Sequence, residues 1–150
     1  MAERRFKFRA EVVLDLRRRR DEEAQRARAA ADAALERAEE ALDEARAKLR
    51  GACERPRESG IDADWYRNWM VGLRSAITRR TEELAGCRRE RDQALARALR
   101  ARRDLRVLER LRDRRQRAFE LNGRRREQRL IDALAIQRYE APTRASGGSS

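Results

Sequence analysis

Apolar residues recur at heptad spacing in the first third of the chain. Leu35, Leu42 and Leu49 lie seven residues apart, and alanines fall between them at alternating steps of three and four. These alanines are Ala31, Ala38, Ala45 and Ala52. Such a repeat predicts a helix whose leucine and alanine side chains form the seam of a coiled coil.

The seam is less regular nearer the N-terminus. Continued backwards in steps of seven, it reaches Arg28 and Asp21 before the next apolar residue, Leu14. The packing there is expected either to be loose or to change to a second register. That register would use the neighbouring apolar residues Val12, Val13 and Leu16.

A break in the helical pattern is expected at about residues 55–62. Pro56 removes a backbone donor and disfavours helix at the preceding residue, and Gly60 suits a turn. Either Asp62 or Asp64 can then cap a second helix, because a carboxylate there accepts from free backbone N–H groups. The second helical stretch carries two apolar ladders, offset by three and four residues as a coiled-coil seam requires. The ladder residues are Leu73, Ile77, Leu84, Cys87, Ala94, Ala98, Ala101, Leu105, Leu108 and Phe119.

These patterns predict an all-α fold in which two long helices form an antiparallel coiled-coil hairpin. The first helix would span about residues 6–54 and the longer second helix about residues 63–140, with a kink near Gly123. Residues 1–141 would form a single domain, and residues 142–150 a flexible tail. With the turn near Glu58, residue 49 would lie opposite about residue 67, and the first helix would cover the second only to about residue 108.

Composition alone fits disorder as well as a long helix. Leu, Ile, Val and Phe make up only 26 of the 150 residues, and the net charge is +12, a combination common in disordered chains. However, Ala, Glu, Lys, Leu and Arg make up 97 residues, which is typical of coiled coils. The heptad periodicity favours the coiled coil.

The positive charge is concentrated in the second helix. Residues 88–129 hold 17 arginines and 7 acidic residues, whereas residues 31–54 hold 4 cations and 7 acidic residues. The basic stretch is either a solvated helix face or a docking surface for an acidic partner. Nucleic acid is a further alternative. No nucleic-acid-binding motif is present and Phe119 is the only aromatic residue of the stretch, so we expect a protein partner and no specific nucleic acid.

Enzyme chemistry is not expected. The chain has no histidine and neither of the glycine-rich phosphate-binding motifs, and a two-helix hairpin offers no enclosed pocket. Cys53 and Cys87 lack the spacing of metal ligands. In the expected hairpin they would lie roughly 35 Å apart along its length, too far for a disulfide. We therefore expect half-buried free thiols, no catalytic residue, no cofactor and no metal. Without an apolar run near the roughly 18 residues of a membrane span, or the apolar stretch of a signal peptide, a cytoplasmic protein is the simplest expectation.

An aromatic cluster follows the break between the helices. Trp65, Trp69, Leu73 and Ile77 form a stripe at i, i+4 spacing, with Tyr66 beside it. The stripe would either close the hairpin end by packing on the first helix or anchor a partner. Some aromatic surface should stay exposed, because a narrow leucine and alanine seam cannot cover two tryptophans and a tyrosine.

Three segments, in this order, resemble proteins of the FliJ family. Residues 6–17 are similar to the family's opening Phe-x-Phe element and its charged helix, and residues 69–77 to its aromatic-x-x-x-Leu-x-x-Ala-Ile segment. Residues 126–135 are similar to its C-terminal Glu-Gln…Asp…Ala element. The resemblance implies a component of the flagellar type III protein export apparatus, shaped like the central stalk subunit of rotary ATP synthases. The equivalent stalk of a virulence injectisome is the alternative.

The resemblance also implies partners, namely the export ATPase ring, the membrane-bound export gate protein and the export chaperones. The residues expected to bind the ATPase are Phe6, Phe8, Arg9, Arg110, Arg114, Arg117, Gln128, Leu130, Ile131 and Asp132. Those expected to bind the gate are Trp69, Leu73, Ala76 and Arg80. Facing the gate residues, the first helix has Ala41, Ala45, Lys48 and Ala52, where relatives can carry larger side chains. The protein would be a monomer and would reach the cytoplasmic face of the inner membrane only through its partners.

Overall fold

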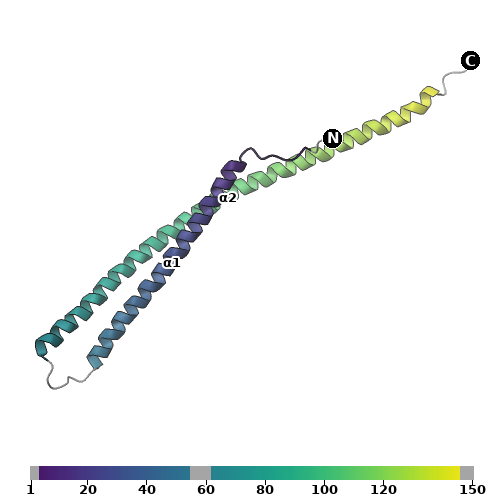
Figure 1. Ribbon diagram of the computed structural model, residues 1–150. Coiled ribbons are helices and arrows are strands. Elements are labelled where there is room, and N and C mark those ends of the chain that lie inside the picture. Colours follow the sequence, from purple (N-terminus) through teal and green to yellow (C-terminus); the bar gives the residue numbers. More distant parts are fainter. Residues whose placement is uncertain (1–3, 55–61, 146–150) are drawn as a thin grey trace, which may run out of the picture. The chain divides into compact units, whose positions relative to one another are not determined.

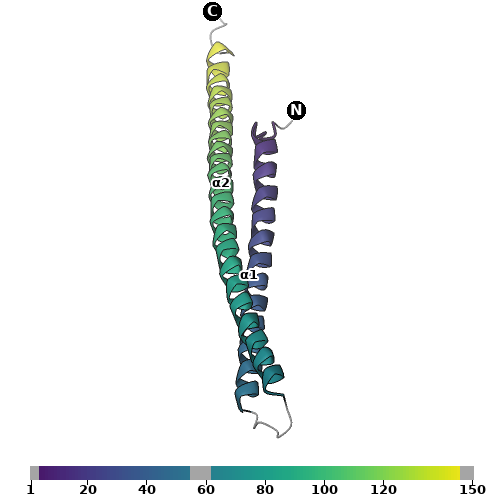
Figure 2. The same ribbon diagram turned by 90° about the vertical axis from the view of Figure 1, so that its left-hand side faces the viewer.

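The computed structural model describes residues 4–54 and 62–145 and is all-α within them. Helix α1 spans Glu11–Glu54 and helix α2 spans Ala63–Ala145. The chain divides into two compact units, one made of Asp15–Leu105 and the other of Met1–Leu14 with Arg106–Ser150. In the Asp15–Leu105 unit, α1 and α2 lie side by side and run in opposite directions (Figures 1 and 2). The predicted antiparallel pair of helices is therefore confirmed.

The helix ends follow local capping. Asp62 caps α2, since its carboxylate accepts from the backbone N–H of Asp64 at 3.0 Å. Helix α1 begins at Glu11, later than predicted, because Arg9 and Ala10 form a turn in which the N–H of Glu11 donates to the carbonyl of Phe8 at 3.1 Å. The acidic side chain of Glu11 also suits the positive end of the helix.

Helix α2 extends further than predicted. It is continuous through Gly123 and includes Pro142 in its last turn before ending at Ala145. Residues 55–61 of the predicted turn and residues 146–150 of the predicted tail lie outside the described residues. Within the described ranges, neither helix has a stretch long and apolar enough to cross a membrane.

The α1 seam keeps one heptad register to its N-terminal end. Leu42 and Ala52 are buried, and the steps of seven continue through half-buried Arg28 to Asp21, which is only 6% exposed. The predicted change of register is wrong, because all three residues that it would use are exposed. These residues are Val12, Val13 and Leu16. The seam therefore becomes polar rather than shifted.

The buried carboxylate of Asp21 has a partner on the opposite helix. Arg102 Nε donates to Asp21 Oδ1 at 3.0 Å, and Gln25 Nε2 adds a longer contact at 3.3 Å. A buried carboxylate is tolerated only when it is hydrogen-bonded and paired. The pair therefore lets a charged residue occupy a seam position.

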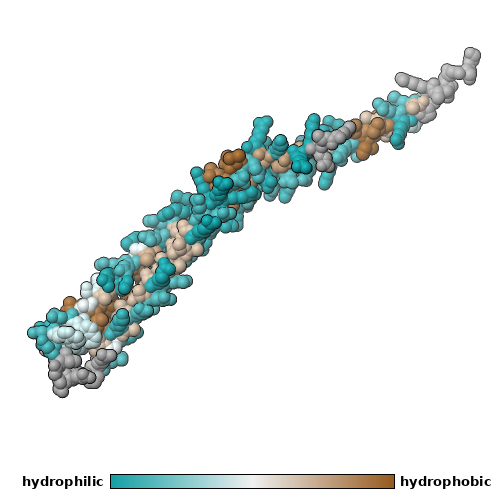
Figure 3. Space-filling view, in the orientation of Figure 1, coloured by the Kyte–Doolittle hydropathy of each residue, from teal (hydrophilic) through white to brown (hydrophobic). Residues whose placement is uncertain are grey.

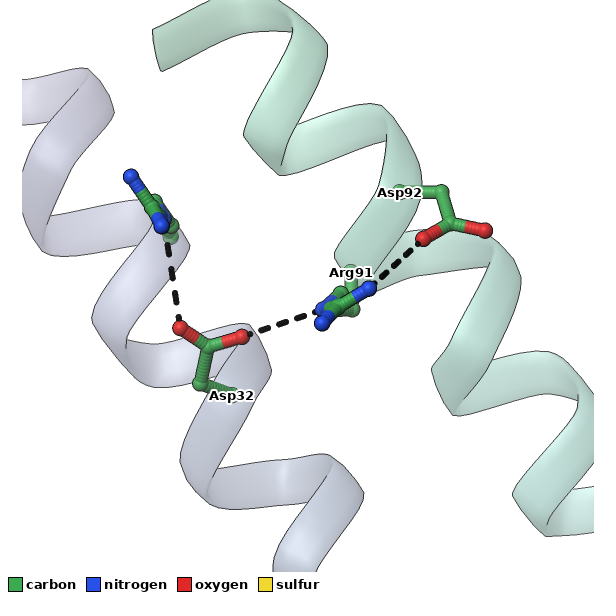
Figure 4. A network of polar contacts seen from close by, with 4 residues as sticks. Asp32, Arg91 and Asp92 are labelled. Atoms are coloured by element: carbon green, nitrogen blue, oxygen red, sulfur yellow. Dashed lines mark hydrogen bonds and ion pairs between the residues drawn. The ribbon is translucent and has the colours of Figure 1, made fainter.

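A second polar contact between the helices involves Asp32. Arg91 Nε donates to Asp32 Oδ1 at 3.4 Å, while Arg91 Nη1 donates to Asp92 Oδ1 at 3.1 Å (Figure 4). These hydrogen bonds, first to Asp92 and then to Asp32, raise the pKa of Arg91 above its ordinary value. Since arginine is already charged at neutral pH, the raised pKa leaves the contact unchanged over the physiological range.

Pairs of opposite charge define the register of the two helices. Asp21 lies opposite Arg102 and Asp32 opposite Arg91, so residue 49 lies opposite about residue 74 rather than the predicted 67. The prediction was about one heptad out. In the observed register the end of α1 faces about residue 69. About the first two turns of α2 therefore extend past the last residue of α1.

We expect the Asp21–Arg102 pair to be required for stability only as a pair. Arg102→Ala should lower the free energy of unfolding by about 1–3 kcal/mol, because it leaves a buried carboxylate with only Gln25 as partner. Replacing both residues with leucine should instead raise it by about 1 kcal/mol or more. Urea unfolding followed by circular dichroism measures both; a neutral Arg102→Ala variant would contradict the assignment.

Two glycines lower the stability of α2 without a packing reason. A Cβ atom added at Gly72 or Gly123 meets no atom within 4 Å. Gly72→Ala and Gly123→Ala should therefore each stabilise the helix by about 1 kcal/mol, the usual difference in helix propensity. Thermal unfolding of each variant checks the sign, and a lowered melting temperature at either position would show that glycine is needed there.

Candidate functional site

An aromatic contact joins the N-terminal segment to α2 in the unit of Met1–Leu14 and Arg106–Ser150. The rings of Phe6 and Phe119 lie 5.7 Å apart between centroids, in a tilted arrangement. Phe8 is buried, with 9% of its surface exposed. Both phenylalanines were expected to bind the ATPase. Phe8 instead anchors the segment by its burial, and Phe6 leaves only part of its ring exposed to a partner.

An open groove lies along this contact. Its volume is about 680 Å³, and its lining combines apolar side chains with cationic ones. The lining residues are Phe6, Lys7, Phe8, Arg9, Ala10, Leu111, Arg115, Ala118, Phe119 and Asn122. Among the described residues, no acidic side chain lines the groove. An apolar segment with acidic flanks would match this lining.

The N-terminal segment is also held by charge. Arg112 Nε lies 3.4 Å from Glu11 Oε2, close enough for an ion pair although its geometry is not that of a hydrogen bond. Leu14, which is fully buried, lies about one helical turn after Glu11. The first turn of α1 is therefore fixed to α2 on both its charged and its apolar sides.

The residues expected to bind the ATPase fall on two faces of α2. A helix turns by about 100° per residue. On that basis Leu130 lies on the same face as Phe119, the face that the N-terminal segment contacts. The opposite face carries Arg110, Arg114, Arg117, Gln128 and Asp132. Ile131 lies between the two faces.

The face opposite Phe119 is exposed and mostly polar, with Leu121 as an exposed apolar residue on it. Gln128 Nε2 donates to Asp132 Oδ1 at 2.9 Å, which joins one turn of the helix to the next. Within the described part of the chain, no ion pair involves Arg110, Arg114 or Arg117. These guanidinium groups are therefore available to an acidic partner.

Residues from both helices form a second surface in the Asp15–Leu105 unit, which we call the tip surface. Trp69 and Leu73 line a hollow of about 310 Å³ with Lys48, Gly51 and Ala52 of α1. All of these residues except Ala52 are half-buried or exposed. Gly51 and Ala52 leave this space on α1, because one has no side chain and the other only a methyl group.

A neighbouring hollow of about 140 Å³ continues the tip surface. Ala76, Arg80 and Leu73 line it together with Ala41 and Ala45. The Arg80 guanidinium donates to Glu83 at 2.9 Å, so its charge is partly balanced within α2. The structure thus brings together all four residues expected to bind the gate and the four residues expected to face them on α1.

The aromatic cluster is partly exposed, as expected. Trp65 stacks on Trp69 with centroids 5.6 Å apart, and Tyr66 meets Trp69 edge-on at 6.0 Å. Trp65 keeps 55% of its surface exposed, whereas Met70 is buried. The cluster therefore uses Met70 for packing and offers a stacked tryptophan pair beside the tip surface.

Two features of these surfaces differ from what the sequence predicted. The pairing of Phe6 with Phe119 was not expected, although Phe119 already stood in the apolar ladder of the second helix. The two thiols also differ from the expectation that both are half-buried. Both cysteines are free, but Cys53 is exposed and only Cys87 is half-buried.

A family model described as "Flagellar FliJ protein" matches residues 6–144, nearly the whole chain. The chain belongs to the FliJ family. No significant match was found among curated proteins or among solved structures. Membership of the FliJ family identifies a component of the flagellar type III export apparatus and supports the flagellar over the injectisome interpretation.

We expect Phe119 to hold the N-terminal segment of this FliJ-family protein on α2. Phe119→Ala removes the ring that Phe6 contacts, so the segment should detach more often and trypsin should cut after Arg9 about tenfold faster. Mass spectrometry of timed digests measures the rate. Leu121→Ala, which truncates an exposed side chain on the same helix, is the control; equal rates for both variants would contradict this role.

Proposed function

We propose that this FliJ-family protein is the stalk of the flagellar export ATPase ring. The residues of 106–141 would enter the ring, promote its assembly and couple it to the export gate and the chaperones. The distribution of the expected binding residues over two faces of α2 carries the proposal. A helix enclosed by a ring meets its partner on every face, whereas a helix docked in a groove meets it on one.

The chemistry of the two faces supports different contacts with the ATPase. Arg110, Arg114 and Arg117 would meet carboxylates of the ring, and their exposure keeps the cost of desolvation low. On the other face, Leu130 is an exposed apolar residue in line with Phe119, and the exposed Arg126 lies between them. The N-terminal segment would complete that face through Phe6 and Arg9.

The tip surface is the proposed docking site for the export gate. Its hollows are lined by alanines, Leu73 and Trp69, together with charged side chains. These charged residues are Glu44, Lys48, Arg79 and Arg80. Large apolar side chains of the gate could fill the space that the alanines leave, and exposed tryptophan is a common interface anchor. No surface is assigned to the chaperones.

The proposed role is mechanical and non-catalytic. The protein would bind at the cytoplasmic face of the inner membrane through the gate and the ATPase. Chemical work would remain with the ATPase, since the proposal assigns this chain no reacting group, metal or cofactor.

The proposal is tested by ATP hydrolysis. The export ATPase from the same organism is assayed with and without this protein, while light scattering follows ring size. Faster hydrolysis together with a shift to hexamers is the expected result. No change in either quantity would overturn the proposal, and the injectisome ATPase and then DNA at physiological salt would be the next partners to assay.

Charge reversal should locate the ATPase-binding surface. Arg114→Glu with Arg117→Glu should weaken ATPase binding about tenfold or more, because two attractive contacts become repulsive. Arg74→Glu with Arg79→Glu makes the same change of net charge beside the tip surface and should have little effect. Isothermal titration calorimetry measures both pairs, and equal weakening would show that only overall charge matters.

A further inference from the structure

The C-terminal part of α2 carries an apolar patch that none of the other described residues covers. Residues 124–141, here called the arm, are exposed throughout. Leu130, Ile131 and Leu134 are 64%, 59% and 55% exposed, and they lie within an arc of about 100° on the helix. Figure 3 shows an apolar patch on this stretch of α2, surrounded by hydrophilic surface. Clustered apolar residues of this kind mark interaction sites.

The charges of the arm differ between its two halves. Residues 124–129 contain four arginines and Glu127, whereas residues 132–140 contain Asp132, Arg138 and Glu140. A second arm packed in parallel would place the two arginine clusters side by side. An antiparallel arm would place each cluster against the acidic half of its neighbour.

We propose that a second copy of this chain covers the patch by antiparallel pairing of the two arms. The two-fold axis would pass between Asp132 and Ala133. Ile131 then lies opposite the partner's Leu134, and Glu127 opposite the partner's Arg138. Because such an interface is isologous, each of these pairs occurs twice.

Charge complementarity selects this register. Glu127 and Arg138 lie on the same face as the apolar patch, one on each side of it, so they would close both ends of the seam. The chain already uses this arrangement between its own helices, where Asp21 at a seam position meets Arg102 at 3.0 Å. A shift of three residues in either direction separates Glu127 from Arg138 and moves Ile131 away from Leu134.

The pairing is compatible with the monomer expected from the hairpin. The hairpin buries its own seam residues between α1 and α2 and needs no second copy for them. The arm lies outside this seam. The shared seam is short, so the dimer should form only at about ten micromolar or above. If the proposed function holds, the second copy would cover Leu130 and Ile131 until the ATPase displaces it.

Sedimentation velocity of the full chain alone, from about 1 to 200 µM, tests the pairing without the ATPase. The wild-type chain should change from monomer to dimer over this range. Glu127→Arg and Arg138→Glu should each weaken dimerisation about tenfold, by placing like charges together twice. Arg129→Glu makes the same charge change as Arg138→Glu on the opposite side of the helix and is its matched control.

Mixing the two variants gives the decisive measurement. In a mixed dimer, the Glu127→Arg chain has arginine at both positions and the Arg138→Glu chain has glutamate at both. Both contacts therefore pair opposite charges again, and mixed dimers should form at least as readily as the wild-type dimer. Recovery on mixing supports the antiparallel register. Three results would overturn it. They are a wild-type chain that stays monomeric to about 200 µM, an Arg138→Glu variant that behaves like its control, or a mixture without recovery.

Discussion

The ion pair between Asp21 and Arg102 constrains the packing of the two helices more than any apolar contact does. A seam of leucine and alanine repeats every seven residues, so apolar burial alone changes little when one helix slips by a heptad. The buried carboxylate does not tolerate that slip. Moved one heptad, Asp21 would face Leu95 or Glu109 instead of Arg102, and either neighbour leaves the carboxylate buried without a positive partner.

Asp32 strengthens the same constraint. In the observed register it meets Arg91, and one heptad away it would face Leu84 or Ala98. The apolar residues bury nearly the same area in each of these registers. Both carboxylates lie opposite an arginine only in the observed one, so they determine which register forms. We infer that the polar positions of this seam specify the alignment, while leucine and alanine supply most of the burial.

This explains why the sequence predicted the helices well and their register poorly. Heptad spacing and the break at Pro56 contain the information for two antiparallel helices, and Asp62 marks where the second begins. The register was instead deduced from the centre of the turn, which placed Asp21 opposite Leu95. Among registers one heptad apart, only the observed one places an arginine opposite both Asp21 and Asp32, so this comparison would have found the alignment. The groove beside Phe6 could not be found this way, because the N-terminal segment is not helical and has no periodicity.

The register also determines what the tip surface offers. Because α2 begins beyond the last residue of α1, Trp65 has no helix opposite it and stays exposed, while Met70, about one turn later, is buried. The hollows beside Trp69 and Leu73 have a separate cause, namely the small residues of α1 that face them. A slip of one heptad toward the predicted register would bring Trp65 over α1 as well and bury the ring surface that a partner could use. The same polar pairs that align the helices therefore keep the aromatic surface available for binding.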